Sequence, residues 1–336
     1  MSTTLSRPFA LMIPRRQLRP KVNNYQLTIE KGEGFELNRS LFERLVLKGY
    51  PHETLSTQHR MRPEISAFVR ELTYPELIDA PSTNQRPDIR GVHSNVVFVD
   101  HDHPEDDNTL IGDRADSGAK SSKQNSHEVQ MVPKIVRYLA QQGYKSENIV
   151  ILTPYLGQLH QLRGALKRDN DPILNELDSL DLARAGVSSS APSDLKTKKG
   201  RIHLATIGKH HPCGYIVVQH SVIDNYQGEE SDIVVASLTR SNKSNAIGFM
   251  DSPERLNVLL SRARDGLILI GNSHTFLQSK KGGALWRQFF TLLDNGQYVY
   301  QGFPVKCERH PERVILLKRA SDFDSFCPDG GCTEPW

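Results

Sequence analysis

Polar and charged residues gather just before two apolar runs in the middle of the chain. The run 233–238 follows a glycine turn with two acids, and the run 267–270 follows a pair of arginines. These residues are Gln227, Gly228, Glu229, Glu230, Arg262 and Arg264. Short apolar runs bounded by turn residues predict buried strands. Two buried strands that each present polar residues at one edge predict a phosphate-binding site.

Apolar runs and helical spacings alternate along most of the chain. Runs typical of strands occupy 95–99, 149–152, 202–207, 233–238 and 267–270. Asn125 and Glu128 resemble a capping box for a helix whose apolar positions recur from Val129 to Leu139. A later segment, 285–293, has one apolar helical face. Alternation of strands and helices from 95 to 280 predicts an α/β fold with a largely parallel sheet.

Composition excludes several classes of protein. With 336 residues and 37% hydrophobic content, the chain is long enough for one or two domains with a proper core. The sequence has no apolar run of about 20 residues, so no membrane association is expected, and four cysteines make no disulfide framework. An intracellular protein is expected, in the nucleus or cytoplasm with the nucleus favoured. A net charge of +3 permits nucleic-acid binding without arguing for it.

Four motifs occur in a defined order. They are QHRMRPEI at 58–65, ILTPY at 151–155, the Gln227-Gly228-x-Glu230 turn, and NVLLSRAR at 257–264. Their order and spacing resemble the second, C-terminal RecA-like domain of superfamily 1 helicases of the up-frameshift type, which are ATP-driven RNA or DNA translocases. The tail, with CERHPER and then CPDGGCTEP, resembles the subgroup that carries zinc fingers and is linked to RNA silencing. The resemblance implies the RecA-like fold of P-loop NTPases.

The resemblance assigns part of the chain to an ATP site. Arg262 matches the arginine finger, whose charge stabilises the transferred phosphoryl group. Arg60 matches an arginine that points at the γ-phosphate. Gln17 matches the motif III glutamine that senses this phosphate, although the preceding Gly-Asp is missing. The other matches are Gln227 and Gly228 in the turn facing the nucleotide, Glu230 on the ribose, and His59 at the position that packs near the adenine.

A second set of residues is assigned to nucleic acid. In the family, the segment matching Thr153, Pro154 and Tyr155 contacts the backbone of a single strand of RNA or DNA. Contacts of this kind hold the strand without reading its sequence. Thr239, at the end of the 233–238 strand, is expected near the same strand. The resemblance therefore assigns residues of this chain both to an ATP site and to a nucleic-acid site.

Two features of an ATPase do not occur in the sequence. There is no P-loop of the form G-x-x-x-x-G-K-[ST], and no paired acids follow a strand to hold magnesium. We expect ATP and Mg²⁺ to bind at a site completed by a first RecA-like domain that is not in this chain. The expected domains are then a remnant at 1–37, a second RecA-like domain at 38–280, and a C-terminal helix with a zinc-finger-like tail at 281–336. Within the second, 184–223 is expected to form a loop and an atypical insertion, of which 208–223 is interpreted as a retained intron.

Metal ligands are suggested in two places. Four Cys/His residues in the tail are enough for a closed zinc site, although their spacing is irregular: Cys307, His310, Cys327 and Cys332. The acidic and histidine-rich stretch 100–105 is better interpreted as a solvated loop, because neighbouring side chains on an extended chain alternate in direction.

Two functions follow. The first is the C-terminal motor domain of an ATP-dependent RNA or DNA helicase in RNA silencing or surveillance, with silencing or surveillance proteins as partners. The alternative is a non-catalytic RecA-like module that binds RNA or a silencing complex, since the P-loop half is absent. Whether this chain is an enzyme is left open by the sequence.

Overall fold

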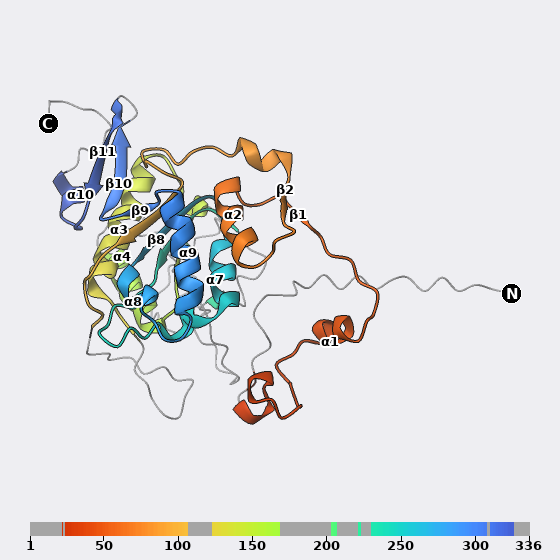
Figure 1. The fold of residues 1–336 in the computed structure, drawn as a ribbon. Coiled ribbons are helices and arrows are strands. Elements are labelled where there is room, and N and C mark those ends of the chain that lie inside the picture. Colours follow the sequence, from red (N-terminus) through yellow and green to blue (C-terminus); the bar gives the residue numbers. More distant parts are fainter. Residues whose placement is uncertain are drawn as a thin grey trace, which may run out of the picture. The chain divides into compact units, whose positions relative to one another are not determined.

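The computed structural model describes residues 22, 24–106, 123–168, 203–206, 221–222, 230–307 and 310–325 (Figure 1). The chain forms two compact units, Met1–Ser56 and Thr57–Trp336. Segments beyond residue 280 belong to the same unit as the central sheet, and the three expected domains stay a prediction. Within the described segments, no helix is long and apolar enough to cross a membrane.

The first unit contains two short 3-10 helices, η1 (Tyr25–Leu27) and η2 (Ile29–Lys31), and the helix α1 (Leu41–Leu47). Ser40 caps α1, since its hydroxyl accepts a hydrogen bond from the Glu43 backbone N–H at 3.1 Å.

A seven-stranded parallel sheet lies at the centre of the second unit. Its strand order is β6 (Ser221–Val222), β5 (His203–Thr206), β4 (Ile149–Thr153), β7 (Ser231–Ser237), β8 (Ala263–Gly271), β3 (Val96–Asp100) and β9 (Val299–Tyr300). The neighbouring strands of this sheet pair in parallel, which confirms the expected fold class. Its central strands are near-continuous Ile, Val and Leu, as expected for strands buried on both faces. Strand β6 falls inside the expected insertion.

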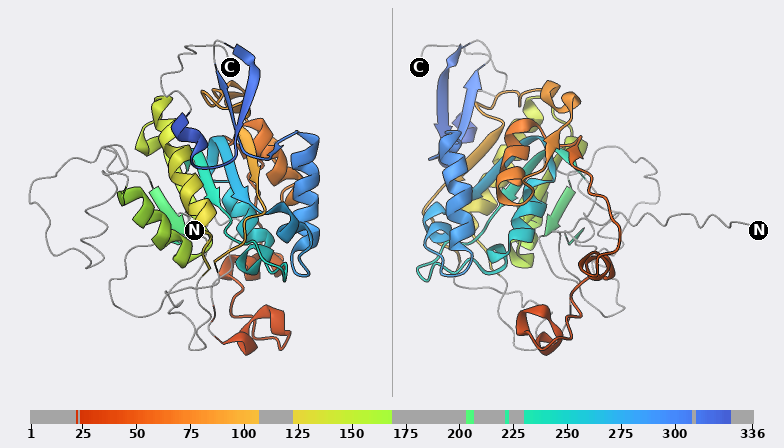
Figure 2. Two further views of the ribbon diagram at one scale, coloured as in Figure 1. Left: turned by 90° about the vertical axis from the view of Figure 1, so that its left-hand side faces the viewer. Right: turned by 45° about the vertical axis from the view of Figure 1, so that its right-hand side comes forward.

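Helices cover both faces of this sheet (Figure 2). One face carries α3 (Ser126–Gln141) and α4 (Leu156–Arg168). The other carries α2 (Pro63–Leu72), α7 (Pro253–Leu260) and α9 (Gly283–Asn295). Shorter elements are η3 (Pro81–Gln85), η4 (Ser146–Asn148), η5 (Gly248–Asp251), α8 (Ser273–Leu277) and α10 (Asp322–Ser325). Two further strand pairs are the parallel β1 (Thr57–Gln58) and β2 (Ile78–Asp79), and the antiparallel hairpin of β10 (Phe303–Cys307) and β11 (His310–Leu317).

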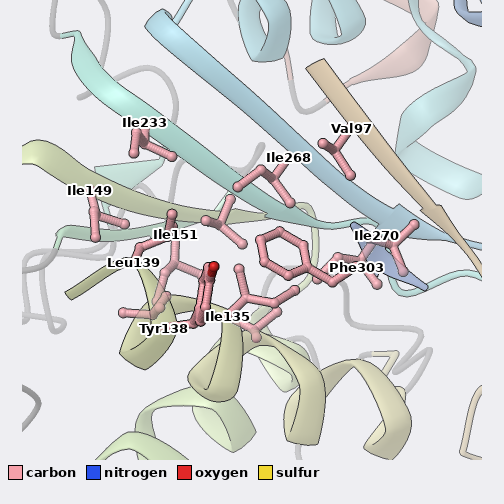
Figure 3. Packing of buried hydrophobic residues seen from close by; sticks show 14 of the residues in the cluster. Val97, Ile135, Tyr138, Leu139, Ile149, Ile151, Ile233, Ile268, Ile270 and Phe303 are labelled. Atoms are coloured by element: carbon pink, nitrogen blue, oxygen red, sulfur yellow. The ribbon is translucent and has the colours of Figure 1, made fainter. Parts of the chain in front are cut away.

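The core between α3 and the sheet is built from alternate residues of each strand. Ile135 and Leu139 of α3 face Ile151 of β4 and Ile268 of β8, and all four are fully buried (Figure 3). On the opposite face, Phe98 of β3 stacks edge-on against a phenylalanine of α9, with ring centres 4.8 Å apart. The apolar face expected at 285–293 thus packs on the sheet.

Pro133 lies in the interior of α3, which continues from Ser126 to Gln141. Helix α7 stops at Leu260. Arg262 lies in the turn that follows, and Arg264 is the second residue of β8.

Candidate nucleotide and nucleic-acid sites

The candidate residues separate into two groups at opposite edges of the sheet. Because the strands are parallel, their amino ends share one edge and their carboxyl ends the other. Glu230 precedes β7 and Arg262 precedes β8, whereas Thr153 ends β4 and Thr239 follows β7. Strand β7 has seven residues, so the two edges are roughly 20 Å apart at about 3.3 Å per residue.

At the amino edge, Arg60 joins the QHRM segment to the residues before β7 and β8. Its Nε donates to a Glu230 carboxylate oxygen at 2.6 Å, and its Nη1 donates to the Ser261 carbonyl at 2.8 Å. The side chain of Gln58 shapes this segment, because its Oε1 accepts from the backbone N–H groups of Arg60 and Met61 at 2.9 and 2.8 Å. Motifs far apart in the sequence therefore meet at one place.

Two more arginines lie at this edge. Arg264 extends the ion-pair cluster, with Nε 3.6 Å from Glu230 and Nη1 3.5 Å from Asp232. Arg262 is only 1% exposed, and its carbonyl accepts from the Ser231 N–H at 3.1 Å. The arginine-finger assignment of Arg262 stays a prediction, and in this structure its guanidinium is covered.

His59 has an exposed side chain, as a residue that packs on a nucleotide base requires. Its carbonyl accepts from Arg86, which also pairs with Asp265 at 3.1 Å. Burial is the main cause that raises the pKa of Asp265, and the charge of Arg86 opposes this effect. Arg86 therefore anchors the backbone beside His59.

At the carboxyl edge, the residues expected to touch nucleic acid lie together but are buried. The hydroxyls of Thr153 and Thr239 are 3.2 Å apart, and both side chains are fully buried. Pro154 and Tyr155 are buried as well. A contact of these four residues with a nucleic-acid strand stays a prediction, and in this conformation it would need main-chain atoms or exposed neighbours.

Tyr155 has structural partners in the same region. Its hydroxyl donates to the Ile247 carbonyl at 3.1 Å and accepts from Arg240 Nη1 at 3.2 Å. Arg240 also pairs with Glu105 at 2.8 Å. Burial raises the pKa of Tyr155, although Arg240 opposes the shift. Burial also disfavours the ionised form of Glu105, but the hydrogen bond and charge of Arg240 outweigh it and lower the pKa of this carboxyl.

The interpretation of 100–105 as a solvated loop was wrong for three of its residues. Asp100 accepts from the backbone N–H and the hydroxyl of Ser273 at 2.8 Å each. The side chains of His101 and Glu105 are 5% and 8% exposed. Alternation along an extended chain sends some side chains inward, and the loop is solvated on one side only.

The sequence did not reveal the buried polar network behind this edge. Glu128 is fully buried and contacts Ser237, Thr239 and His101 through its carboxylate. Gln158 joins this network by donating to the Ser237 hydroxyl at 2.9 Å. The only signal was the capping-box spacing of Asn125 and Glu128, which suggested a local role in the helix.

Other predicted site residues fall outside the described residues. These are Gln17, Gln227, Gly228, Cys327 and Cys332. Cys307 and His310 are register partners in the β10–β11 hairpin. Among the described residues there is no cluster of three or more potential metal ligands.

An all-parallel sheet with helices on both faces, carrying arginines and acids at its amino edge, defines a RecA-like domain. The sequence also matches the AAA domain family over residues 37–274. The chain belongs to this family and, within it, to the superfamily 1 helicases of the up-frameshift type.

Three relatives illustrate this membership. The mouse (Mus musculus) NFX1-type zinc finger-containing protein 1 is 34% identical over 95% of this chain and 14% of the relative. A Schizosaccharomyces pombe protein, the helicase required for RNAi-mediated heterochromatin assembly 1, is 30% identical over 84% of this chain and 23% of its own length. Regulator of nonsense transcripts 1 of Dictyostelium discoideum is 28% identical over 84% of this chain and 18% of its own length. The chain thus spans less than a quarter of each relative.

Proposed function

We propose that this chain is the C-terminal motor domain of an ATP-dependent helicase that acts on single-stranded RNA or DNA in RNA silencing or surveillance. One observation carries the proposal. Arg60 contacts Glu230 and Ser261 directly, so three motifs separated by up to 201 residues build one charged site. The names of the S. pombe and D. discoideum relatives, which refer to RNAi and to nonsense transcripts, support the biological setting.

The residues present fit one half of an ATP site. Arg60 and Arg262 would supply positive charge where negative charge develops on the phosphoryl oxygens, with Gln17 beside them. Glu230 and exposed His59 would hold the ribose and the base, aided by the Gln227-Gly228 turn. The sequence contains no P-loop, so the groups that hold the phosphates and Mg²⁺ would come from a P-loop domain packed against this one.

The carboxyl edge would hold the nucleic acid. Strand β7 connects Glu230 at one edge with Thr239 at the other, so the two sites share a rigid element. Movement of the domain during the ATP cycle would then carry the 153–155 segment along the single-stranded nucleic acid. The partners would be silencing or surveillance proteins in the nucleus or cytoplasm.

The experiment joins this chain behind a P-loop-bearing first RecA-like domain of an up-frameshift helicase and measures RNA-stimulated ATP hydrolysis. Arg60→Ala should lower the rate on the order of 10² or more, because a preorganised cation is removed from the reacting phosphate. Arg313→Ala, on the exposed side of β11, is the control and should leave the rate unchanged. Arg60 is preferred to Arg262 because it is 27% exposed and its loss threatens folding less.

The alternative is the non-catalytic module. A joined protein that binds single-stranded RNA, hydrolyses no ATP and is indifferent to Arg60→Ala would support it and refute the motor proposal. Failure of both activities in a folded protein would refute both.

We also propose that Cys307, His310, Cys327 and Cys332 bind one structural zinc ion. The support is the opposed register of Cys307 and His310 together with the cysteines of the tail. Purified protein should contain one equivalent of zinc, and Cys327→Ala combined with Cys332→Ala should abolish it. Zinc content that is unchanged in this double variant would refute the proposal.

A further inference from the structure

The turn that follows β7 has an unusual backbone. The N–H of Arg240 donates to the Leu238 carbonyl at 2.7 Å, which closes a three-residue γ-turn around Thr239. Thr239 has a φ of 71°. A positive φ is rare for a β-branched residue, and a γ-turn with this sign of φ is strained. Such a conformation persists only where the surroundings fix it.

Glu128 is the group that fixes it. Both carboxylate oxygens of Glu128 accept from the Thr239 backbone N–H, at 3.0 and 2.9 Å. One of them also accepts from the Ser237 hydroxyl at 2.5 Å, and the other lies 3.2 Å from His101 Nε2. The two residues on either side of Leu238 are therefore held by a single carboxylate.

This role is not that of an ordinary capping box. Asn125 caps α3 as expected, because its Oδ1 accepts from the N–H groups of His127 and Glu128. In a capping box, Glu128 would accept from the Asn125 N–H in return. That N–H donates to Gln158 Oε1 at 2.8 Å instead. The carboxylate of Glu128 is thereby left for β7.

Burial makes the hydrogen bond between Glu128 and the Thr239 N–H necessary to both residues. Glu128 and Thr239 are both completely buried. A buried carboxylate needs hydrogen-bond donors to offset its lost hydration, and the first turn of a helix adds favourable N–H dipoles. Rotation of the Thr239 peptide away from Glu128 would leave the carboxylate short of a donor. The γ-turn and the buried carboxylate therefore stabilise each other.

The turn decides where the next residues lie. Beyond it, Arg240 reaches Glu105 at 2.8 Å and the Ser241 hydroxyl accepts from Asn272 Nδ2 at 2.8 Å. The chain then emerges at the carboxyl edge with Lys243 and Ser244 exposed. Lys243 is therefore a cation at the carboxyl edge of the sheet. The buried segment 153–155 and the proposed nucleic-acid site lie at the same edge.

We propose that Glu128 is a positioning residue that holds the γ-turn at Thr239 and so presents Lys243 to the phosphates of a single-stranded nucleic acid. The proposal rests on the proposed function, which supplies the nucleic acid. It assigns Glu128 a role through Thr239 and assigns Lys243 the direct contact.

The test is a double-mutant cycle on the whole chain, with fluorescence anisotropy of a labelled single-stranded oligo(U) RNA. Glu128→Gln should weaken binding about tenfold, because an amide has one acceptor oxygen where the carboxylate has two. Thr239→Gly is the reference variant of the cycle, because glycine adopts positive φ without strain and does not need Glu128 to hold the turn. Adding Glu128→Gln to Thr239→Gly should weaken binding by no more than about twofold relative to Thr239→Gly alone. If Glu128→Gln caused the same loss with and without Thr239→Gly, the proposal would be overturned.

Lys243→Gln is the matched comparison. Lys243→Gln should weaken binding and lower the slope of the logarithm of the binding constant against the logarithm of the salt concentration by about 1 in magnitude. Glu128→Gln should weaken binding with little change in this slope. No change in affinity or slope for Lys243→Gln would overturn the assigned contact.

Amide exchange separates this proposal from the proposed function. In Glu128→Gln, the segment 237–242 should exchange much faster than in the original chain, whether or not RNA is bound. If the original chain binds no RNA, the proposed function fails, and the exchange result still decides the role of Glu128. If Glu128→Gln does not fold, recovery of folding by Thr239→Gly supports the positioning role, and failure to recover refutes it.

Discussion

Arg60 and Glu230 form an ion pair across 170 residues of sequence, with Nε 2.6 Å from the carboxylate oxygen. Both residues are assigned to the same nucleotide, one at the γ-phosphate and one at the ribose. In this structure the guanidinium of Arg60 and the carboxylate of Glu230 bind each other. Binding of ATP as proposed would therefore require the guanidinium to leave the carboxylate, so the pair sets the starting state of the site.

The pair should contribute little to stability. The side chains of Arg60 and Glu230 are 27% and 39% exposed, and half-exposed pairs are typically worth about 1 kcal/mol or less. Glu230→Gln should thus lower the free energy of unfolding by no more than about 1 kcal/mol, measured by urea denaturation. In the joined protein, the same variant should raise the KM for ATP. A stability loss well above this value would mean that the pair is structural.

A different result is expected for Arg62, two residues along the chain. The residue is 6% exposed, and its guanidinium donates to Glu64, Asp88 and two carbonyls. Burial alone would lower the pKa of Arg62, but the hydrogen bonds and charges of Glu64 and Asp88 outweigh it and raise the pKa.

Arg62→Lys should lower the free energy of unfolding by about 1–3 kcal/mol, because an ammonium group cannot reach all of these acceptors. Urea denaturation measures the change. Arg313→Lys, at an exposed position, is the control and should change stability by less than about 0.5 kcal/mol. Equal effects in the two variants would contradict this assignment of roles.

Much of the fold follows from local pattern. The run 149–152, the run 233–238 and the spacing of Val129 to Leu139 specify two strands and a helix that the structure contains. The described crossovers from β3 to β4, from β4 to β5, from β7 to β8 and from β8 to β9 carry helices, as parallel pairing of strands favours. Local pattern was less reliable at boundaries: α7 ends before Arg262, and α3 runs through Pro133.

The contacts of the site were beyond reach from the sequence. Arg60 and Glu230 are separated in the chain by β3, β4, β5 and β6 of the sheet, and periodicity carries no information on such distant pairs. Asn125 and Glu128 looked like a local cap, and only the position of β7 reveals that Glu128 serves Thr239. Tyr155 was assigned to the nucleic-acid contact, but its hydroxyl hydrogen-bonds to Arg240 and to the Ile247 carbonyl. Long-range polar contacts depend on tertiary packing that short motifs do not encode.

His127 should make stability depend on pH. Burial, together with the charges of His101 and His103, lowers its pKa from 6.5 to about 4. The ring of His103 stacks on it with centres 3.8 Å apart. Between these two pKa values the unfolded chain binds a proton that the folded chain does not, so stability falls as the pH falls from about 6.5 towards about 4.

Urea denaturation at pH 7.5 and pH 5 measures this effect. His127→Gln should reduce the loss of stability at pH 5 relative to the original chain, since glutamine does not titrate. His52→Gln, at an exposed histidine of the first unit, should leave the pH dependence as it was. An unchanged pH dependence in His127→Gln would contradict the role given to this residue.

Gly248 should be intolerant of a side chain for two reasons. Its φ is 55°, and a Cβ at this position would lie 2.5 Å from Tyr155 Oη and 2.9 Å from Arg240 Nη1. Gly49 has a similar φ of 81° but no atom within 4 Å of a Cβ. Gly49→Ala should therefore lose only the strain term, about 1 kcal/mol, whereas Gly248→Ala should lose more, about 2–3 kcal/mol. Because Tyr155 and Arg240 shape the carboxyl edge, Gly248→Ala should also weaken RNA binding in anisotropy, and Gly49→Ala should not. If the two alanine variants matched in stability and in RNA binding, the contact between Gly248 and the Tyr155–Arg240 pair would have no part in either.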